Sequence, residues 1–248
     1  MLRRVNDLKD LSIAATDGDI GGLEDIYFDD VSWTVRYLVV DTGTWLPGRK
    51  VLISPMSVRA ANSGRESLPV SLTKAQVEQS PSIETDLPVN RQYEVEYSRY
   101  YGYPYYWTGP YRWGNTRYPE EVLASGGQPV EPISDAVGDP RLRSARDVMG
   151  YYIEASDGDI GHVEDFLIDD REWAIRFMIV DTRNWLPGRK VLVSPDWISR
   201  VSWRDSRVYV GLTKQGVESA PEYDPTRPLA RDYETRLFGH YGRRSYWE

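Results

Sequence analysis

The chain contains Trp45-Leu46-Pro47-Gly48-Arg49-Lys50-Val51-Leu52 and repeats it unchanged as Trp185-Leu186-Pro187-Gly188-Arg189-Lys190-Val191-Leu192. The two stretches are 140 residues apart, and the same offset relates Asp17-Gly18-Asp19-Ile20-Gly21 to Asp157-Gly158-Asp159-Ile160-Gly161. A constant offset without gaps indicates that one structural unit has been duplicated. The fold of the chain can therefore be predicted from the pattern within one copy.

The duplication extends over almost the whole chain. At the same offset, Leu72-Thr73-Lys74 matches Leu212-Thr213-Lys214, Tyr93-Glu94 matches Tyr233-Glu234, and Tyr106-Trp107 matches Tyr246-Trp247. We expect two similar domains, at residues 1–80 and 141–220. Residues 81–140 should form an extension and linker rich in Tyr, Gly and Pro, and residues 221–248 an aromatic tail.

Each copy shows the alternation of apolar residues that is typical of short strands. In a strand over residues 33–40, one face carries Trp33, Val35, Tyr37 and Val39, and the second copy has Trp173, Ile175, Phe177 and Ile179 at these positions. We expect that face to be core. The apolar run before it ends at Asp29-Asp30, which indicates a hairpin turn between two strands.

Three further strands are predicted in the first copy, at residues 51–53, around residues 58–60 and at residues 68–72. The turn between the last two is marked by Asn62-Ser63-Gly64, and by Arg204-Asp205-Ser206 in the second copy. Five or six short strands per copy predict a mainly β fold of two small closed barrels in tandem. A short helix should follow each barrel, because Thr73 and Gln76 form a capping box, which Gly216 leaves incomplete in the second copy.

The extension after the first domain is rich in tyrosine. Residues 97–118 include Tyr97, Tyr100, Tyr101, Tyr103, Tyr105, Tyr106 and Tyr111 together with Trp107 and Trp113. We expect no regular structure there, because Gly and Pro interrupt the segment. Tyr and Trp provide a large contact area with few rotatable bonds, which suits a binding surface. The alternative is that the segment covers the two barrels within the chain, and the sequence favours neither.

Composition disfavours several classes of protein. The 248 residues are 40% hydrophobic, which is enough for packed cores. Since 30 Lys and Arg stand against 38 Asp and Glu, the net charge of −8 argues against nucleic-acid binding. The absence of cysteine from the sequence fits a reducing, cytoplasmic location. No apolar run approaches the roughly 18 residues of a membrane span, and the N-terminus does not resemble a signal peptide, so we expect any membrane contact to be peripheral.

The order of these motifs resembles the PRC-barrel family. The resemblance rests on the turn at Asp17, the hairpin at Asp29-Asp30, the strand that ends in Val40-Asp41-Thr42, and the stretch from Trp45 to Pro55, all of which recur in the second copy. The family includes the cytoplasmic domain of the photosynthetic reaction centre H subunit, the C-terminal domain of the ribosome maturation factor RimM, and many small bacterial proteins. It implies a docking barrel, because known members act mostly through protein contacts. This chain has neither the membrane helix of the H subunit nor the N-terminal domain of RimM, so neither specific function is carried over.

We find no arrangement of residues that predicts catalysis or a metal site. The acidic turn at Asp17 fails as a calcium loop, because Gly21 and Phe28 stand where loop positions five and twelve require oxygen ligands. Both histidines, His162 and His240, belong to the second copy, so no Ser-His-Asp arrangement is common to the two copies. We therefore expect a protein without enzymatic activity, cofactor or metal.

The candidate partner-binding residues are Trp45 and Arg49, with Trp185 and Arg189 in the second copy. Trp and Arg are enriched at the hot spots of protein interfaces. The alternative is that these residues, which flank a Pro-Gly turn, form a packing lid on the barrel. We expect the two barrels to pair within the chain and to bind a protein partner. A second hypothesis is a peripheral component of a photosynthetic or electron-transfer complex at the inner membrane, similar to the H-subunit domain.

Overall fold

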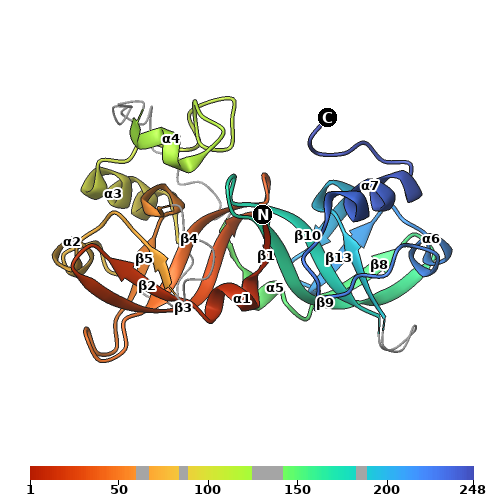
Figure 1. Ribbon diagram of the computed structural model, residues 1–248, viewed down its shortest axis with the longest axis horizontal. Helices are drawn as coiled ribbons and strands as arrows, with labels where there is room; N and C mark the ends of the chain where they lie inside the picture. Colours follow the sequence, from red (N-terminus) through yellow and green to blue (C-terminus); the bar gives the residue numbers. More distant parts are fainter. Residues whose placement is uncertain (60–66, 84–88, 125–141, 183–188) are drawn as a thin grey trace. The chain divides into compact units, whose positions relative to one another are not determined.

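A computed structural model describes residues 1–59, 67–83, 89–124, 142–182 and 189–248 (Figure 1). The chain divides into two compact units. The first unit consists of Met1, Arg3–Arg146 and Asp169–Ala174, and the second of Leu2, Asp147–Ile168 and Ile175–Glu248. The fold is mainly β, as the sequence predicts.

The first unit is built around the strands β2 (Ser12–Ala15), β3 (Gly18–Asp29), β4 (Thr34–Asp41), β5 (Lys50–Ile53) and β6 (Ser67–Pro69). Their hydrogen-bonded order is β5-β4-β3-β2-β6, antiparallel except for the parallel pair β2 and β6. A further strand, β7 (Leu142–Ser144), pairs with β3. The helical segments are α1 (Val5–Lys9), a 3₁₀ turn η1 (Pro55–Ser57), α2 (Lys74–Glu78), α3 (Arg91–Tyr101) and α4 (Pro119–Ala124).

The second unit repeats this order with β8 (Tyr152–Ala155), β9 (Gly158–Asp169), β10 (Ala174–Asp181), β11 (Lys190–Val193), β12 (Ile198–Ser202) and β13 (Arg207–Val210). The strands are arranged as β11-β10-β9-β8-β13-β12, and β1 (Leu2–Arg4) pairs with β9. The helical segments are α5 (Ala145–Val148), η2 (Pro195–Trp197), α6 (Lys214–Glu218) and α7 (Arg231–His240). The hairpin predicted at Asp29-Asp30 and its counterpart join β3 to β4 and β9 to β10.

The structure does not confirm the predicted closed barrels, since the sheet is not closed among the described strands. In the first unit the hydrogen-bonded order runs from β5 to β6, and in the second unit it runs from β11 to β12. In the first unit the chain leaves β5 through η1, and Val58 then bridges Val70 beside β6. The three residues of η1 connect β5 to this bridge. The turn expected at Asn62-Ser63-Gly64 lies outside the described residues.

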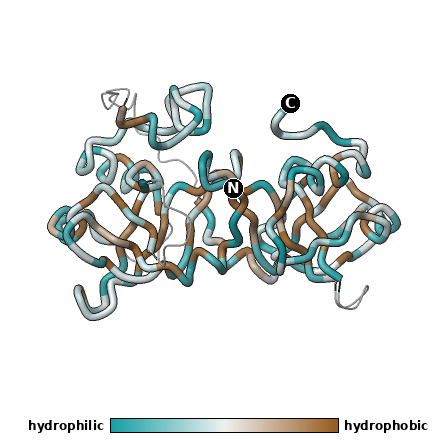
Figure 2. The backbone as a smooth tube through the Cα atoms, viewed as in Figure 1, coloured by the Kyte–Doolittle hydropathy of each residue, from teal (hydrophilic) through white to brown (hydrophobic). Residues whose placement is uncertain are grey.

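The strand β4 is buried on both faces, whereas the alternation of apolar residues predicts one. Every residue from Thr34 to Val40 is buried. The helix α3 packs against one face of β4, where Tyr97 lies edge-on to Tyr37 with ring centroids 5.1 Å apart. Figure 2 shows apolar residues concentrated along the strands of each unit and polar residues in the connections. Trp33 itself is buried but precedes β4, with a positive φ of 50°.

The repeated Asp-Gly-Asp-Ile-Gly motif begins in the turn between β2 and β3 and forms the first residues of β3. The Asp17 carboxylate accepts a hydrogen bond of 2.8 Å from the backbone N–H of Lys74, at the start of α2. Gly21 lies so close to β4 that a Cβ atom there would be 1.9 Å from the carbonyl oxygen of Asp41. The capping box of Thr73 and Gln76 is present at α2, and Thr213 alone caps α6, as predicted.

The extension after the first domain contains helices, so the prediction of irregular structure is wrong. The helix α3 begins after Asn90, whose side chain accepts a hydrogen bond of 2.9 Å from the N–H of Tyr93. It ends at Gly102, which takes the left-handed conformation with φ of 68°. The helix α7 occupies the corresponding place in the second unit. Within the described ranges, no helix is long and apolar enough to cross a membrane.

Candidate functional site

A buried carboxylate holds two neighbouring aromatic side chains in the first unit. Glu94 lies on the buried side of α3 and is 3% exposed. The hydroxyl of Tyr106 donates a hydrogen bond of 2.6 Å to Oε1 of Glu94, and Oε2 of Glu94 forms an ion pair of 2.9 Å with Arg91. Hydrogen bonds to a charged acceptor are stronger than those between neutral groups. Glu94 thereby fixes the position of the Tyr106 ring.

Two guanidinium groups cover the faces of the aromatic rings. Arg36, from β4, lies 3.7 Å from the centroid of Tyr106, and Arg91 lies 4.0 Å from the centroid of Trp107. The two rings are nearly perpendicular, with centroids 4.9 Å apart. A cation over an aromatic face is attracted by the ring quadrupole. We call this arrangement of Arg36, Arg91 and Glu94 around Tyr106-Trp107 the first slot.

The electrostatics of the first slot follow from its burial. Burial raises the pKa of Glu94 above its usual value, although Arg91, Tyr106 and Arg36 act in the opposite direction. Burial and the adjacent Glu94 carboxylate raise the pKa of Tyr106. Its hydroxyl therefore keeps its proton and can donate a hydrogen bond to Glu94. Burial lowers the pKa of Arg36, and the hydroxyl of Tyr37 donates a further hydrogen bond of 3.3 Å to Glu94.

The second unit contains the same arrangement, which we call the second slot. The hydroxyl of Tyr246 donates a hydrogen bond of 2.6 Å to Glu234, which pairs with Arg231 at 3.1 Å. Arg176 lies 4.1 Å from the centroid of Tyr246, and Arg231 lies 4.1 Å from that of Trp247. The two rings again stand nearly perpendicular, 4.8 Å apart. All five residues of the first slot therefore recur at the offset of 140.

The two slots differ in how deeply they enclose their aromatic residues. Tyr106 is 7% exposed, whereas Tyr246 is only half-buried and Trp247 is 38% exposed. Phe177 replaces Tyr37, so this position cannot donate a hydrogen bond to the carboxylate of the second slot. Phe238 instead packs edge-on against Trp247, at 5.4 Å.

The repeats in the sequence contain the residues of both slots but do not show that these residues come together. The repeats of Tyr93-Glu94 and Tyr106-Trp107 were visible, but Arg36 comes from a strand more than fifty residues earlier in the chain. An arginine in the middle of an otherwise apolar strand, present in both copies, is the signal that could have pointed to a buried polar partner.

The structure places Arg49 and Arg189 against the helices that follow each sheet. The guanidinium of Arg49 donates to the carbonyl oxygens of Glu78 and Ser80, and Arg189 donates to those of Glu218 and Ala220. Cationic side chains at the C-terminal end of a helix satisfy carbonyls that lack partners within the helix. Both arginines therefore have a structural role.

Trp45 lies on the turn before β5 and is half-buried, with Nζ of Lys74 4.4 Å from its ring centroid. Backbone hydrogen bonds fix this turn, from Trp45 N–H to Thr42 and from Arg49 N–H to Leu46. The prediction for Trp185 falls outside the described residues.

Most aromatic residues of the tyrosine-rich extension face the interior of the first unit. Tyr97, Tyr103, Tyr105, Tyr106 and Trp113 are buried, with Trp113 only 2% exposed. Tyr100 and Tyr111 remain exposed, at 39% and 56%. The buried residues support the interpretation as intramolecular cover, and only the exposed pair fits a partner surface.

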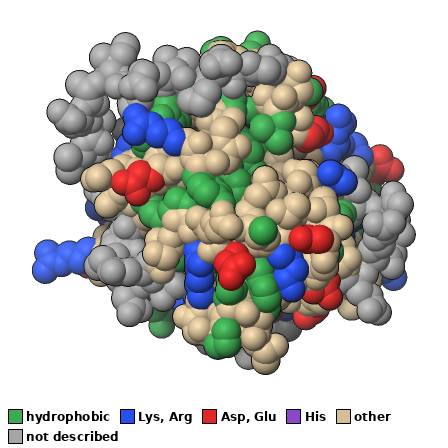
Figure 3. Space-filling model, turned by 90° about the vertical axis from the view of Figure 1, so that its left-hand side faces the viewer, with side chains coloured by type: hydrophobic (Ala, Val, Ile, Leu, Met, Phe, Trp, Pro, Cys, Tyr) green, Lys and Arg blue, Asp and Glu red, His purple; other side chains and the backbone are tan. Residues whose placement is uncertain are grey.

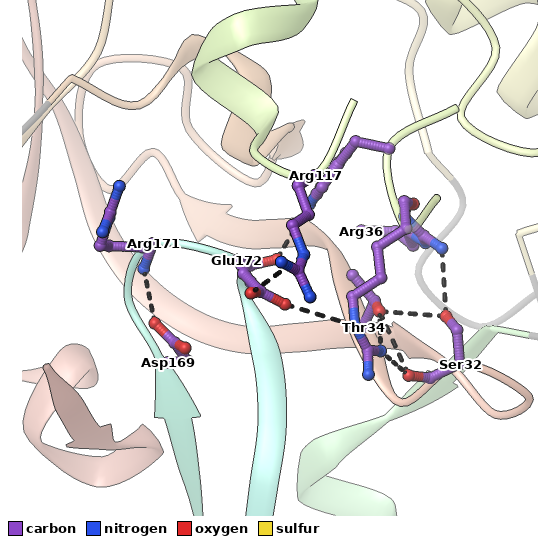
Figure 4. A network of polar contacts seen from close by, with 9 residues as sticks. Ser32, Thr34, Arg36, Arg117, Asp169, Arg171 and Glu172 are labelled. Atoms are coloured by element: carbon purple, nitrogen blue, oxygen red, sulfur yellow. Dashed lines mark hydrogen bonds and ion pairs between the residues drawn. The ribbon is translucent and has the colours of Figure 1, made fainter. Parts of the chain in front are cut away.

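The extension also holds a turn from the second copy of the repeat that belongs to the first unit (Figure 4). The indole N–H of Trp113 donates to the carbonyl of Glu172 at 2.9 Å, and Arg112 and Arg117 approach the Glu172 carboxylate at 3.7 and 3.9 Å. Arg36 also contributes here, donating to the Ser32 hydroxyl at 3.1 Å. These contacts hold the turn at Glu172 against the extension within the first unit. Among the described residues, no cluster of three His, Cys, Asp or Glu could hold a metal ion.

The strands β2 to β6 lie within a segment of the first copy that matches the model of a known family. Residues 2–77 match the model of the PRC-barrel domain. The first copy of the repeat is therefore similar to a PRC-barrel domain, and the match includes Arg36 but ends before Arg91, Glu94 and Tyr106. The first slot thus contains one residue from the matched segment and four residues from the extension that follows it. No curated protein matches the chain.

Proposed function

We propose that this chain is a non-enzymatic adaptor in which two PRC-like barrels in tandem bind a protein partner. The supporting observation is the position of Trp45. Its ring is half-buried on a turn that is closed by backbone hydrogen bonds, and the ammonium group of Lys74 lies 4.4 Å from it. A large aromatic ring that is held rigidly at the surface loses little conformational entropy on binding. Trp residues of this kind dominate the energy of many interfaces.

The tandem organisation is part of the proposal. The strand order β5-β4-β3-β2-β6 of the first unit matches the order β11-β10-β9-β8-β13 of the second. Two linked modules would bind a repeated or dimeric partner more tightly than one, because the second binding event is intramolecular. The face of the first unit that carries α2 has apolar side chains between scattered charges, as Figure 3 shows. Such a mixed surface is typical of interfaces between proteins that also exist separately.

Arg49 and Arg189 enter the proposal as supports for the binding turn. Each guanidinium ties the residue that follows the Pro-Gly pair in the sequence to the end of the neighbouring helix. Trp45 and Trp185 are then the residues that would contact the partner. A peripheral component of a membrane electron-transfer complex is the second candidate, and co-sedimentation of the chain with membranes distinguishes it from a cytoplasmic adaptor.

The test is affinity capture with the full chain and the double substitution Trp45→Ala and Trp185→Ala. We expect the captured amount of the partner to fall at least tenfold, while circular dichroism and the melting temperature stay close to those of the unchanged chain. Tyr152→Ala, which removes an aromatic ring that is 51% exposed and lies outside both candidate surfaces, is the matched control and should leave capture unchanged. Equal capture by the double variant would exclude these tryptophans as the binding surface. Unfolding of the variant would show that they are needed for the packing of the fold.

A further inference from the structure

The two slots bind the same pair of residues through the same contacts. In each, the tyrosine hydroxyl is 2.6 Å from a glutamate oxygen, and a guanidinium from the central strand lies on the tyrosine ring. The arginine of the helix lies 4.0 Å from the tryptophan centroid in the first slot and 4.1 Å in the second. The site therefore has three specific requirements, namely a phenol hydroxyl, a tyrosine face and an adjacent indole face.

In the second slot, a short segment outside the regular elements supplies these groups. Residues 243–248 belong to no helix or strand, and the indole of Trp247 is 38% exposed. The backbone N–H of Arg243 donates to Phe238 at 3.0 Å, while the contacts from Tyr246 and Trp247 to the slot are made by side chains. Such a segment resembles a bound peptide more than a part of the sheet, because side chains and not strand pairing hold it in place.

We propose that the second slot is a peptide-binding site for a Tyr-Trp sequence, which residues 246–247 of the chain itself occupy in this structure. A partner that presents an exposed Tyr-Trp segment competes for Arg176, Arg231 and Glu234. Buried Glu234 provides specificity, since a phenylalanine in place of the tyrosine leaves its carboxylate without the 2.6 Å hydrogen bond. This site is separate from Trp45, so failure of one proposal leaves the other standing.

The first test empties the slot in the full chain with the double substitution Tyr246→Ala and Trp247→Ala. The probe is a fluorescently labelled peptide with the sequence of residues 243–248, Arg-Arg-Ser-Tyr-Trp-Glu. Fluorescence anisotropy should show binding to the emptied variant at least tenfold tighter than to the unchanged chain, whose slot is occupied. A peptide with Tyr246→Phe should bind at least fivefold more weakly, and Glu234→Gln in the emptied variant should reduce that difference. Equal binding of both peptides, or no binding to a folded emptied variant, contradicts the proposal.

A second measurement uses the unchanged chain and does not depend on the stability of the variant. Excess unlabelled peptide should accelerate hydrogen exchange in residues 243–248, because it displaces them, and should leave exchange in β8 to β10 unaffected. If the emptied variant unfolds and the peptide changes no exchange rate in the unchanged chain, Tyr246 and Trp247 are a fixed part of the fold. The proposal is then wrong.

Discussion

At the scale of single residues, the notable feature is a carboxylate that is retained inside the first unit. Glu94 is 3% exposed and contacts groups from α3, β4 and the extension. Removing one member of such a buried polar network leaves the others without partners, which costs more than the bond itself contributes. Its environment also makes the stability of the unit depend on pH.

Glu94→Gln should change that pH dependence. Burial raises the pKa of Glu94 in the folded chain, so the folded state keeps the proton at pH values where the unfolded state has lost it. The stabilisation from this proton is complete below the unfolded pKa of about 4.3 and is lost as the pH rises through the folded pKa. The free energy of unfolding of the unchanged chain, minus that of Glu94→Gln, should thus fall as the pH rises from about 4.3 through the folded pKa. Urea denaturation at several pH values measures it.

Glu120→Gln is the control for this series, since Glu120 is an exposed glutamate on α4. It removes a carboxylate from the surface of the chain, so it separates the effect of burial from the effect of net charge. A difference between wild type and Glu94→Gln that stays constant over the whole range would mean that the Glu94 pKa is not raised.

Tyr37 allows a second prediction, because the repeat provides its natural variant. Tyr37 is 3% exposed, and Phe177 stands at the same position of the second copy. Tyr37→Ala should lower the free energy of unfolding by about 3–5 kcal/mol, as truncation of a buried aromatic side chain usually does. Tyr37→Phe removes only the 3.3 Å hydrogen bond to Glu94 and should cost about 1 kcal/mol. Chemical denaturation compares them, and similar losses for both variants would contradict the packing of this strand.

At the scale of elements, the first residues of β3 depend on a close approach to β4. A Cβ atom on Gly21 would lie 1.9 Å from the carbonyl oxygen of Asp41, whereas one on the neighbouring Gly22 would meet nothing within 4 Å. Gly21→Ala should therefore destabilise the first unit by well over 1 kcal/mol, while Gly22→Ala should be nearly neutral. Thermal melts of the two variants test this. Similar melting temperatures would show that the strands can shift to accept a side chain at residue 21. The close approach to β4 would then not explain why the glycine is repeated.

The same elements show what the sequence could and could not predict. Local signals sufficed for β3 to β5, for the hairpin and for the helix cap at Thr73, because each depends on residues that are close in sequence. The helix α3 also had such signals in Asn90 and Gly102, but the many Tyr, Gly and Pro residues around it favoured an irregular segment. The burial of both faces of β4 and the slots depend on contacts between distant segments, which no periodicity reveals.

At the scale of the whole molecule, duplication explains why two surfaces recur. The turn that carries Trp45 is identical in sequence at Trp185, and the first slot has a counterpart with the same geometry. The sheet of each unit is not closed among the described strands, and in each unit a 3₁₀ turn, η1 or η2, follows the strand β5 or β11. An adaptor with two equivalent modules requires that the repeated surface, and not one copy, contacts the partner.

Cross-linking mass spectrometry on the captured complex tests this account most directly. Lys74 lies 4.4 Å from the Trp45 ring, and Lys214 occupies the corresponding position in the second copy. An amine-reactive reagent should link the partner to both lysines, and Trp45→Ala with Trp185→Ala should abolish these links together with the complex. A stable complex that is linked only elsewhere on the chain, and that survives the double substitution, would contradict the account.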